Sequence, residues 1–410
     1  MTGFHKLSRD EKIKKIKALS GLDESDMKSL EGPLDASVAE MMSENVIGTV
    51  KLPFGIAVNF VINGRKYLIP MCIEEPSVVA AASNAAKLAL PCGFRAECSQ
   101  PVMIGQVQLV GISDTNKARE SILSGISTIK KLANGRDSVM VKLGGGLEDV
   151  EVRLIGSSRG PMVVVHLIVN VVDAMGANCV NSMCEAVAPY LEEVTGGRAV
   201  LKIISNLADR RLAAAAAVWK KDVIGEDVIE GILDAYELAR VDAYRCATNN
   251  KGIMNGVDAV AIATGNDFRA LEAGAHAYAA IGRYRPLAEY EKNSEGDLVG
   301  RLKMPLAVGI VGGATKTNPV ARTSLKILGV KSASELACVM ACVGLANNFA
   351  ALRAIVSEGI QRGHMKLHAK NIAMSAGASH EEAVSVSTKM IEDKKISVSH
   401  AKKILEEMRK

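Results

Sequence analysis

Residues 161–178 read PMVVVHLIVNVVDAMGAN, an apolar run that ends in a polar turn containing one glycine. The apolar part, 161–172, predicts a buried strand, and the residues after the turn predict a helix at about 177–194. A glycine-containing turn between a strand and a helix presents free backbone N–H groups, which suit a pyrophosphate. The alternative is that Asp173 and Asn178 only cap the helix.

This strand, turn and helix belong to an alternation of elements that fills residues 101–205. The hydrophobic pattern predicts, in order, strand 102–111, helix 115–133, strands near 138–143, 149–156 and 161–172, helix 177–194 and strand 199–205. The order approximates β-α-β-β-α-β, the split-βαβ or ferredoxin-like arrangement, with one extra strand. We therefore expect a small domain at 101–205.

The segments on either side of this small domain are rich in Ala and in helical periodicity. We expect 1–100 and 206–360 to form one large, helix-rich domain into which the small domain is inserted. Its predicted elements are a hairpin with the turn Asn63-Gly64, helices at 207–219, 224–247 and 334–357, and strands at 257–263 and 304–311. Polar helices at 381–393 and 399–409 predict a separate C-terminal flap, 361–410. The fold class is therefore α+β.

Composition excludes several functional classes. Hydrophobic residues make up 48% and charged residues 23% of the 410 positions, a globular balance that excludes a disordered chain. Only 3% are aromatic, which argues against the stacking platforms of single-strand binders. The 50 basic and 45 acidic residues are interspersed, so no polyanion-binding stripe stands out and we expect no nucleic-acid partner.

Neither a membrane segment nor a metal centre is predicted. The charged N-terminus lacks the apolar core of a signal peptide. The longest uncharged apolar stretch, Leu336 to Leu352, falls short of the ~20 residues of a membrane span and suits a buried core helix. The eight cysteines include no CxxC pair, so we expect no zinc site and a reducing, cytoplasmic location.

Two polar segments interrupt apolar texture near predicted element ends. Glu74-Glu75-Pro76-Ser77 stands between a strand and a helix, where acidic residues normally complement the helix dipole. A catalytic role would need one carboxyl shielded enough to stay protonated near neutrality. Gly312-Gly313 opens a loop that resembles an anion-binding loop, but this signal alone is weak and a turn after a buried strand is the better explanation without further evidence.

A third polar segment, 245–256, reads RCATNNKGIMNG and runs into the predicted strand 257–263. Lys251 and Asp267 bracket that strand and could meet through the loops. A structural salt bridge is one interpretation; an ammonium held over a developing oxyanion is the other. A fourth segment, 363–371, carries His364 and His368 at the spacing of a zinc pair, but a third ligand is not evident. A single catalytic His on a mobile segment fits better, and a lone surface His is the remaining alternative.

Seven segments in one order together resemble 3-hydroxy-3-methylglutaryl-coenzyme A (HMG-CoA) reductase, in the soluble class II form of bacteria and archaea. They are ENVIG at 44–48, EEPS at 74–77, DAMGAN at 173–178, RCATNNKGIMNG at 245–256, ATGNDFRA at 263–270, GGATKTNP at 312–319 and GHMKLHAKN at 363–371. The resemblance implies a mevalonate-pathway enzyme in which two hydrides from a nicotinamide cofactor convert HMG-CoA to mevalonate and CoA. The same enzyme run as a mevalonate-degrading oxidoreductase is the alternative.

The resemblance also implies four catalytic residues. Lys251 would stabilise the oxyanion, and Asp267 would orient Lys251 and couple it to Glu75. Glu75, with a raised pKa, would protonate the aldehyde intermediate as it becomes an alcohol. His364, with His368 as the less favoured alternative, would protonate the departing CoA thiolate.

Binding residues follow from the same resemblance. Ser77, Arg245 and Asn255 should hold the hydroxymethylglutaryl group, with Arg245 on its carboxylate. The cofactor should lie on the turn formed by Asp173, Met175, Gly176, Ala177 and Asn178. Asp137 should meet the adenine ribose, where its charge repels a 2′-phosphate, so NADH is favoured and NADPH is the second option. Class II enzymes form dimers or assemblies of dimers with shared active sites, and the segment 44–48 is the expected interface.

Overall fold

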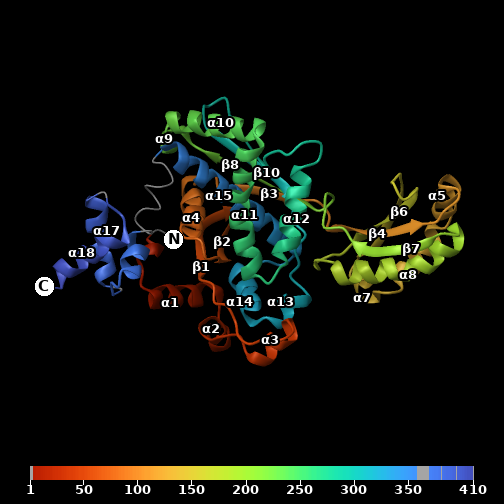
Figure 1. The fold of residues 1–410 in the computed structure, drawn as a ribbon, viewed down its shortest axis with the longest axis horizontal. Coiled ribbons are helices and arrows are strands. Elements are labelled where there is room, and N and C mark those ends of the chain that lie inside the picture. Colours follow the sequence, from red (N-terminus) through yellow and green to blue (C-terminus); the bar gives the residue numbers. More distant parts are fainter. Residues whose placement is uncertain (1–2, 358–368, 380, 394, 410) are drawn as a thin grey trace.

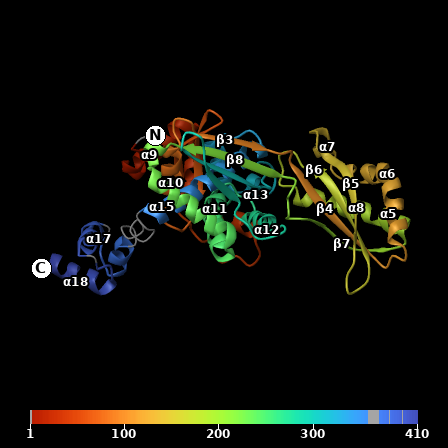
Figure 2. The same cartoon turned by 90° about the horizontal axis from the view of Figure 1, so that it is seen from above.

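The computed structural model describes residues 3–357, 369–379, 381–393 and 395–409. The described chain is elongated (Figures 1 and 2), with a large central body, a smaller sheet at one end and a group of helices at the other. Segments far apart in sequence build the central body, because the chain leaves it after β3 (Phe94–Cys98) and returns at β8 (Leu212–Trp219). The fold is α+β, as the sequence predicts.

A six-stranded sheet organises the central body. Its strands lie in the order β2 (Arg65–Cys72), β1 (Phe54–Ile62), β3, β8, β10 (Leu298–Pro305) and β9 (Ala288–Lys292). The hairpin between β1 and β2 turns at Asn63 and Gly64, both with positive φ, as the sequence predicts. The core of the central body also includes α15 (Ala333–Ser357), where the Phe349 ring stacks on Trp219 with centroids 3.8 Å apart.

The long helix α15 is apolar on all sides because it runs through this core. By length and composition it could cross a membrane, and 67% of its most apolar window is buried inside the protein. Helices α4 (Val78–Leu88), α10 (Glu226–Val241) and α11 (Ala243–Ala263) pack against α15. The other helices of the body are α9 (Lys221–Ile224), α12 (Phe268–Ala279), α13 (Gly313–Thr317) and α14 (Pro319–Leu328).

The N-terminal residues fold against α14. They form a short 3-10 helix (Phe4–Lys6), α1 (Arg9–Ser20), α2 (Glu24–Glu31) and α3 (Ala36–Met42). Ser8 begins α1 with a complete capping box, since its backbone N–H donates to Glu11 and its hydroxyl accepts from the Glu11 backbone. Phe4, Ile16 and Met27 pack with Ile327 of α14 into a separate small core.

The smaller sheet has four antiparallel strands in the order β5 (Gly146–Ile155), β6 (Met162–Asn170), β4 (Val102–Val110) and β7 (Arg198–Ile204). Helices α5 (Thr115–Ser124), α6 (Ile126–Asn134) and α8 (Ala177–Thr195) contribute to its core, together with Met140 from the short helix that follows α6. Gly105 of β4 lets α8 come close, because a Cβ there would lie 2.5 Å from the Cys184 sulfur. The order is the expected β-α-β-β-α-β with no extra strand.

The strand predicted near 138–143 is wrong. These residues form the short helix α7 (Ser138–Lys142), because the Asp137 carboxylate caps it by accepting from the backbone N–H of Met140 at 2.9 Å. The glycines at 144–146 therefore connect a helix to a strand.

Two more predictions give the wrong type of element: one expected helix is a strand, and one expected strand is helical. The helix expected at 207–219 is the strand β8, whose alanines alternate between a buried and a half-buried face. The strand expected at 257–263 is the second half of α11. It is buried on most sides, so its apolar residues show no helical period. Of the strand expected at 304–311, only the first two residues are in a strand, since β10 stops at Pro305.

The C-terminal helices form their own core. A helical stretch at 369–375 packs with α17 (Glu382–Glu392) and α18 (Val398–Met408) around Val386, Met390 and Ile404. They lie at the end of the molecule opposite the smaller sheet (Figure 2).

Candidate active site

The polar segments 74–77 and 245–256 meet on the central body. The Lys251 ammonium donates to Oε2 of Glu75 at 2.7 Å, and the Asn255 side-chain amide donates to the same oxygen at 3.4 Å. Lys251 and Asn255 lie one turn apart on α11, so both reach across to the loop before α4. The Lys251 and Glu75 side chains are 59% and 36% exposed, so this cluster is open to a ligand.

Ser77, in the loop beside Glu75, has an unusual backbone conformation. Its φ of 75° and ψ of −20° lie in the left-handed region that rarely suits a side chain. Ser77 begins α4 without donating or accepting a side-chain cap. The Ser77 hydroxyl therefore does not make the capping bond that is usual for a serine at this position, and it can bind a ligand instead.

Arg245 lies on α11, nearer its N-terminus than Lys251. The side chain is half-buried, and burial lowers the pKa of its guanidinium below the usual value. Among the described residues no carboxylate pairs with it. A half-buried cation without an anion is suited to the carboxylate of a ligand.

Asp267 does not contact Lys251 in the described structure. It caps α12, accepting from the backbone N–H groups of Arg269 and Ala270 at 3.0 and 3.1 Å. The sequence-based idea that the two meet around a strand is wrong, because a continuous helix separates them. From Lys251 to the end of α11 the helix rises about 18 Å.

Asp267 instead faces a cleft of about 920 Å³ between the central body and the smaller sheet. Five of the six predicted cofactor residues line this cleft with it: Asp137, Met175, Gly176, Ala177 and Asn178. The sixth, Asp173, uses its carboxylate to accept from the Ala333 backbone at the start of α15, at 2.7 Å. Asp173 therefore fixes the turn to the central body.

The turn at 173–178 is suited to an anion. Gly176 begins α8 with φ 106° and no side chain caps the helix there. The first backbone N–H groups of a 19-residue helix are therefore presented to the cleft. The alternative that Asn178 merely caps the helix is wrong, since the cap residue is Gly176.

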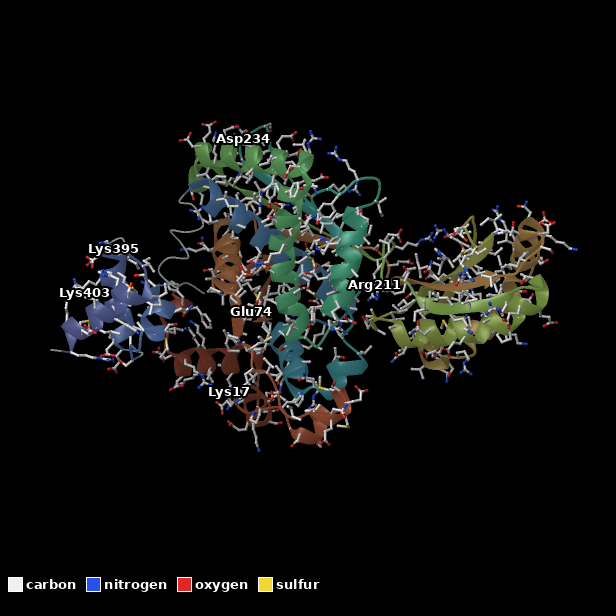
Figure 3. The ribbon with its side chains drawn as sticks, in the orientation of Figure 1. Lys17, Glu74, Arg211, Asp234, Lys395 and Lys403 are labelled. Carbon is white, nitrogen blue, oxygen red and sulfur yellow. The ribbon has the colours of Figure 1, made fainter. Side chains whose placement is uncertain are left out.

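Buried contacts behind the cleft hold this turn in place. Arg211 is 5% exposed and donates to the carbonyls of Ala174 and Met175 at 3.1 Å, and to that of Val308. Burial lowers the pKa of its guanidinium to about 10. Figure 3 shows Arg211 where the central body meets the strands that lead to the smaller sheet. The Arg211 guanidinium thus connects the turn at 173–178 to the central body.

Gly309 and Arg136, which the sequence did not single out, also line the cleft. Asn266 accepts from the Gly309 backbone at 2.8 Å, and Gly309 lies so close to the turn that a Cβ would be 2.6 Å from the Met175 nitrogen. Gly309 precedes the Gly312-Gly313 loop, which also lines the cleft. Arg136 enters from the smaller sheet's side. Its adjacency to Asp137 was the signal that could have identified it.

Two predicted residues cannot be placed. His364 and the alternative His368 lie outside the described residues.

Comparisons with known proteins identify the family. Residues 8–369 match the model of hydroxymethylglutaryl-coenzyme A reductase. The 3-hydroxy-3-methylglutaryl-coenzyme A reductase of Archaeoglobus fulgidus is 56% identical over 410 residues, 99% of this chain and 94% of that protein. The probable reductase of Borreliella burgdorferi is 37% identical over 343 residues, 81% of this chain and 77% of that protein.

Solved structures agree. The class II reductase from Streptococcus pneumoniae, bound to NADPH in open conformations, superposes with a TM-score of 0.83 at 41% identity, covering 98% of this chain and 100% of that one. A second structure from the same organism gives a TM-score of 0.84. The chain therefore belongs to the HMG-CoA reductase family, in its class II form.

Proposed function

We propose that the cluster of Glu75, Lys251 and Asn255 is the centre at which this chain reduces HMG-CoA to mevalonate and CoA in the mevalonate pathway. One observation carries the assignment. Helix α11 bears Lys251 and Asn255, and its C-terminal end, at Ile262, enters the cleft with the anion-binding turn. A substrate on the cluster and a nucleotide in the cleft would thus lie along one helix.

The cluster supplies the polar groups that the reduction of a thioester requires. The Lys251 ammonium would stabilise the oxyanion that forms at the thioester and aldehyde carbonyls, which is typically worth ~3–4 kcal/mol per donor. The Glu75 carboxyl would give a proton to the aldehyde oxygen, and Asn255 orients that carboxyl. His364 would protonate the CoA thiolate.

Substrate binding would involve the groups on either side of the cluster. The Arg245 guanidinium would bind the free carboxylate of the hydroxymethylglutaryl group bidentately. The Ser77 hydroxyl, which makes no capping bond, would donate to an oxygen of the same group.

The cleft fits a dinucleotide. Its size, the uncapped start of α8 and the backbone approach at Gly309 suit a pyrophosphate held by N–H groups. A nicotinamide cofactor bound there supplies the two hydrides. Met175, Gly176, Ala177 and Asn178 would hold it, with Asp173 fixing the turn. We propose NADH as the preferred cofactor because of Asp137, and NADPH as the second, since Arg136 lines the same cleft.

The exposed segment before β1 supports a dimer with shared sites. Ile47 and Val50 are 105% and 92% exposed, which is costly for large apolar side chains in an isolated chain. They belong to the region of the predicted interface at 44–48. Asp267 does not contact Lys251 of its own chain in the described structure, so the proposed coupling of the two would require a site shared between subunits.

We propose one role for each of the three expected domains. Residues 1–100 and 206–360 would form the substrate domain, 101–205 the cofactor domain, and 361–410 a flap that carries His364 near its start. All eight cysteines are free thiols, which supports a reducing cytoplasm.

Purified protein tests the proposal through oxidation of NADH and NADPH in the presence of HMG-CoA. We expect turnover that Glu75→Gln, Lys251→Ala and His364→Ala each abolish. The neighbouring Glu74→Gln is the matched control, because Glu74 is exposed on the same loop (Figure 3). Equal losses in Glu74→Gln and Glu75→Gln would contradict the assignment, and absence of turnover in folded wild-type protein would overturn the function.

A further inference from the structure

Two cysteines from distant parts of the chain meet in the central body. Cys98 is the last residue of β3 and Cys338 lies on α15, 240 positions later, and their sulfur atoms are 3.1 Å apart. Both residues are partly exposed, so a small oxidant can reach them. Because a disulfide bond is about 2.0 Å long, a shift of about 1 Å brings these sulfurs to bonding distance.

The surroundings give the two thiols different roles. The Cys98 thiol lies within donor distance of the Cys338 sulfur and, at 3.2 Å, of the carbonyl oxygen of Ser334. The hydrogen bond from Cys98 lowers the pKa of Cys338, although burial and the carboxylates of Glu335 and Glu97 oppose this shift. The same hydrogen bond, together with burial, raises the pKa of Cys98. Cys338 is therefore the thiol that ionises first, and the thiolate is the form that attacks an oxidant.

The cysteine pair lies beside the anchors of the turn at 173–178, on which we place the cofactor. The Asp173 carboxylate of this turn accepts from the backbone of Ala333, at the start of α15. Cys98 belongs to β3, which leads toward the smaller sheet (Figure 2) and whose partner strand β8 begins directly after Arg211. The Arg211 guanidinium holds two carbonyls of the turn, and its charge also acts on Cys98. A movement of β3 toward α15 would therefore disturb both anchors.

We propose that Cys98 and Cys338 form a reversible disulfide when the protein meets a peroxide, and that this bond weakens binding of the nicotinamide cofactor by shifting the anchors of the turn at 173–178. The disulfide is a property of the folded chain alone, whereas its effect on the cofactor rests on the function proposed above. Cys342, one turn further along α15, is fully buried and is not reached by the oxidant.

With hydrogen peroxide as the oxidant, the reaction has two steps. The Cys338 thiolate attacks one peroxide oxygen and the O–O bond breaks, so that a sulfenic acid forms and the leaving hydroxide takes up the proton that Cys338 released. The Cys98 sulfur then attacks the sulfenic sulfur. The S–S bond forms, the S–O bond breaks, and the leaving hydroxide takes the Cys98 proton. Two thiols and one peroxide thus give one disulfide and two waters, and a dithiol reductant reverses the bond by thiol–disulfide exchange.

Peptide mapping without reductant tests the bond. After hydrogen peroxide treatment of the reduced full-length protein, we expect a peptide pair joined through Cys98 and Cys338 that dithiothreitol separates. In Cys98→Ser the pair should be absent, and dimedone should trap a sulfenic acid at Cys338. Cys92→Ser removes an exposed thiol outside the pair and is the matched control, which should keep the link. Absence of the linked pair in treated wild type, or its presence only with other cysteines, would overturn the proposal.

Titration with NADH and NADPH, followed by their fluorescence, tests the effect on binding without turnover. We expect the Kd of the better-bound cofactor to rise about tenfold on oxidation of wild type and of Cys92→Ser, and to return with dithiothreitol. Cys98→Ser should bind as reduced wild type does before and after peroxide, which also shows that the variant is folded. An unchanged Kd in linked wild type would refute the effect on the cofactor. Neither measurement needs HMG-CoA, so a failed reductase assay would count against the proposed function and not against the disulfide.

Discussion

The Lys251 ammonium lies 2.7 Å from a carboxylate oxygen of Glu75, which is 176 positions away in the chain. Because both side chains are substantially exposed, the pair contributes little to folding. A lysine that is not needed for stability but is held against an acid by two separate elements is instead suited to act on a ligand.

Lys251→Met therefore should lower kcat by about 10²–10³-fold, since one oxyanion donor is lost. The free energy of unfolding should change by no more than about 0.5 kcal/mol. Steady-state kinetics and denaturant titration measure the two effects. Lys292→Met breaks the comparable surface pair with Glu230 and should change neither. Similar kcat values for the two variants would contradict a special role for Lys251.

Ser77 allows strain and chemistry to be separated. Ser77→Gly removes the hydroxyl and also the cost of a side chain at φ 75°, so it should stabilise the fold by about 1 kcal/mol. Ser77→Ala removes only the hydroxyl and should leave stability unchanged. Both should raise KM for HMG-CoA by about tenfold, through one lost hydrogen bond. A KM that is unchanged in both variants would exclude the hydroxyl from substrate binding.

Arg211 and Arg210 are neighbours with opposite environments. Arg211→Met leaves the carbonyls of Ala174, Met175 and Val308 without their donor, and should lower the free energy of unfolding by about 3 kcal/mol and raise KM for the nicotinamide cofactor. Arg210→Met removes a surface pair with Glu151 and should cost less than about 1 kcal/mol. Equal destabilisation in the two variants would show that the buried contacts do not hold the turn.

The sequence predicted the smaller sheet well because its signals are local. An apolar strand such as 162–170 followed by a glycine turn predicts a strand and a helix without reference to the rest of the chain. The Asn63-Gly64 hairpin and the Ser8 capping box are local in the same way. The sequence predicts Glu75 and Lys251 as site residues in two separate motifs, and only the tertiary structure could show their contact.

The failures occur where the surroundings decide the element. The Ala-rich run at 212–219 favours a helix by propensity, but pairing with β3 and β10 on both sides makes it a strand. The apolar run at 257–263 lies in a helix that is buried on most sides, which removes the polar face that reveals a helical period. The second error led directly to the mistaken contact between Lys251 and Asp267.

The C-terminal helices contain a pH-dependent contact. The Arg409 guanidinium, followed by the Ser379 backbone, lowers the pKa of Glu382 from 4.5 to about 2. The stabilisation is therefore complete above the unfolded value of 4.5 and is lost as pH falls toward 2. Hydrogen exchange of α17 should be faster in Arg409→Ala than in wild type above pH 4.5, and the difference should shrink in acid. A difference that grows in acid would have the wrong sign for this contact.

Asp137 and Arg136 stand side by side on the cofactor cleft with opposite consequences for a 2′-phosphate. Oδ1 of Asp137 caps α7, so Asp137→Ser tests the charge while keeping the cap. We expect the ratio of kcat/KM for NADH to that for NADPH to fall about tenfold in Asp137→Ser, because a repulsive charge is removed. Arg136→Met should move the ratio the other way, since it removes a cation that a 2′-phosphate would use. Lys142→Met, at the end of α7 and outside the cleft lining, is the control and should leave the ratio unchanged. A ratio that neither Asp137→Ser nor Arg136→Met alters would mean that the adenine ribose lies elsewhere in the cleft.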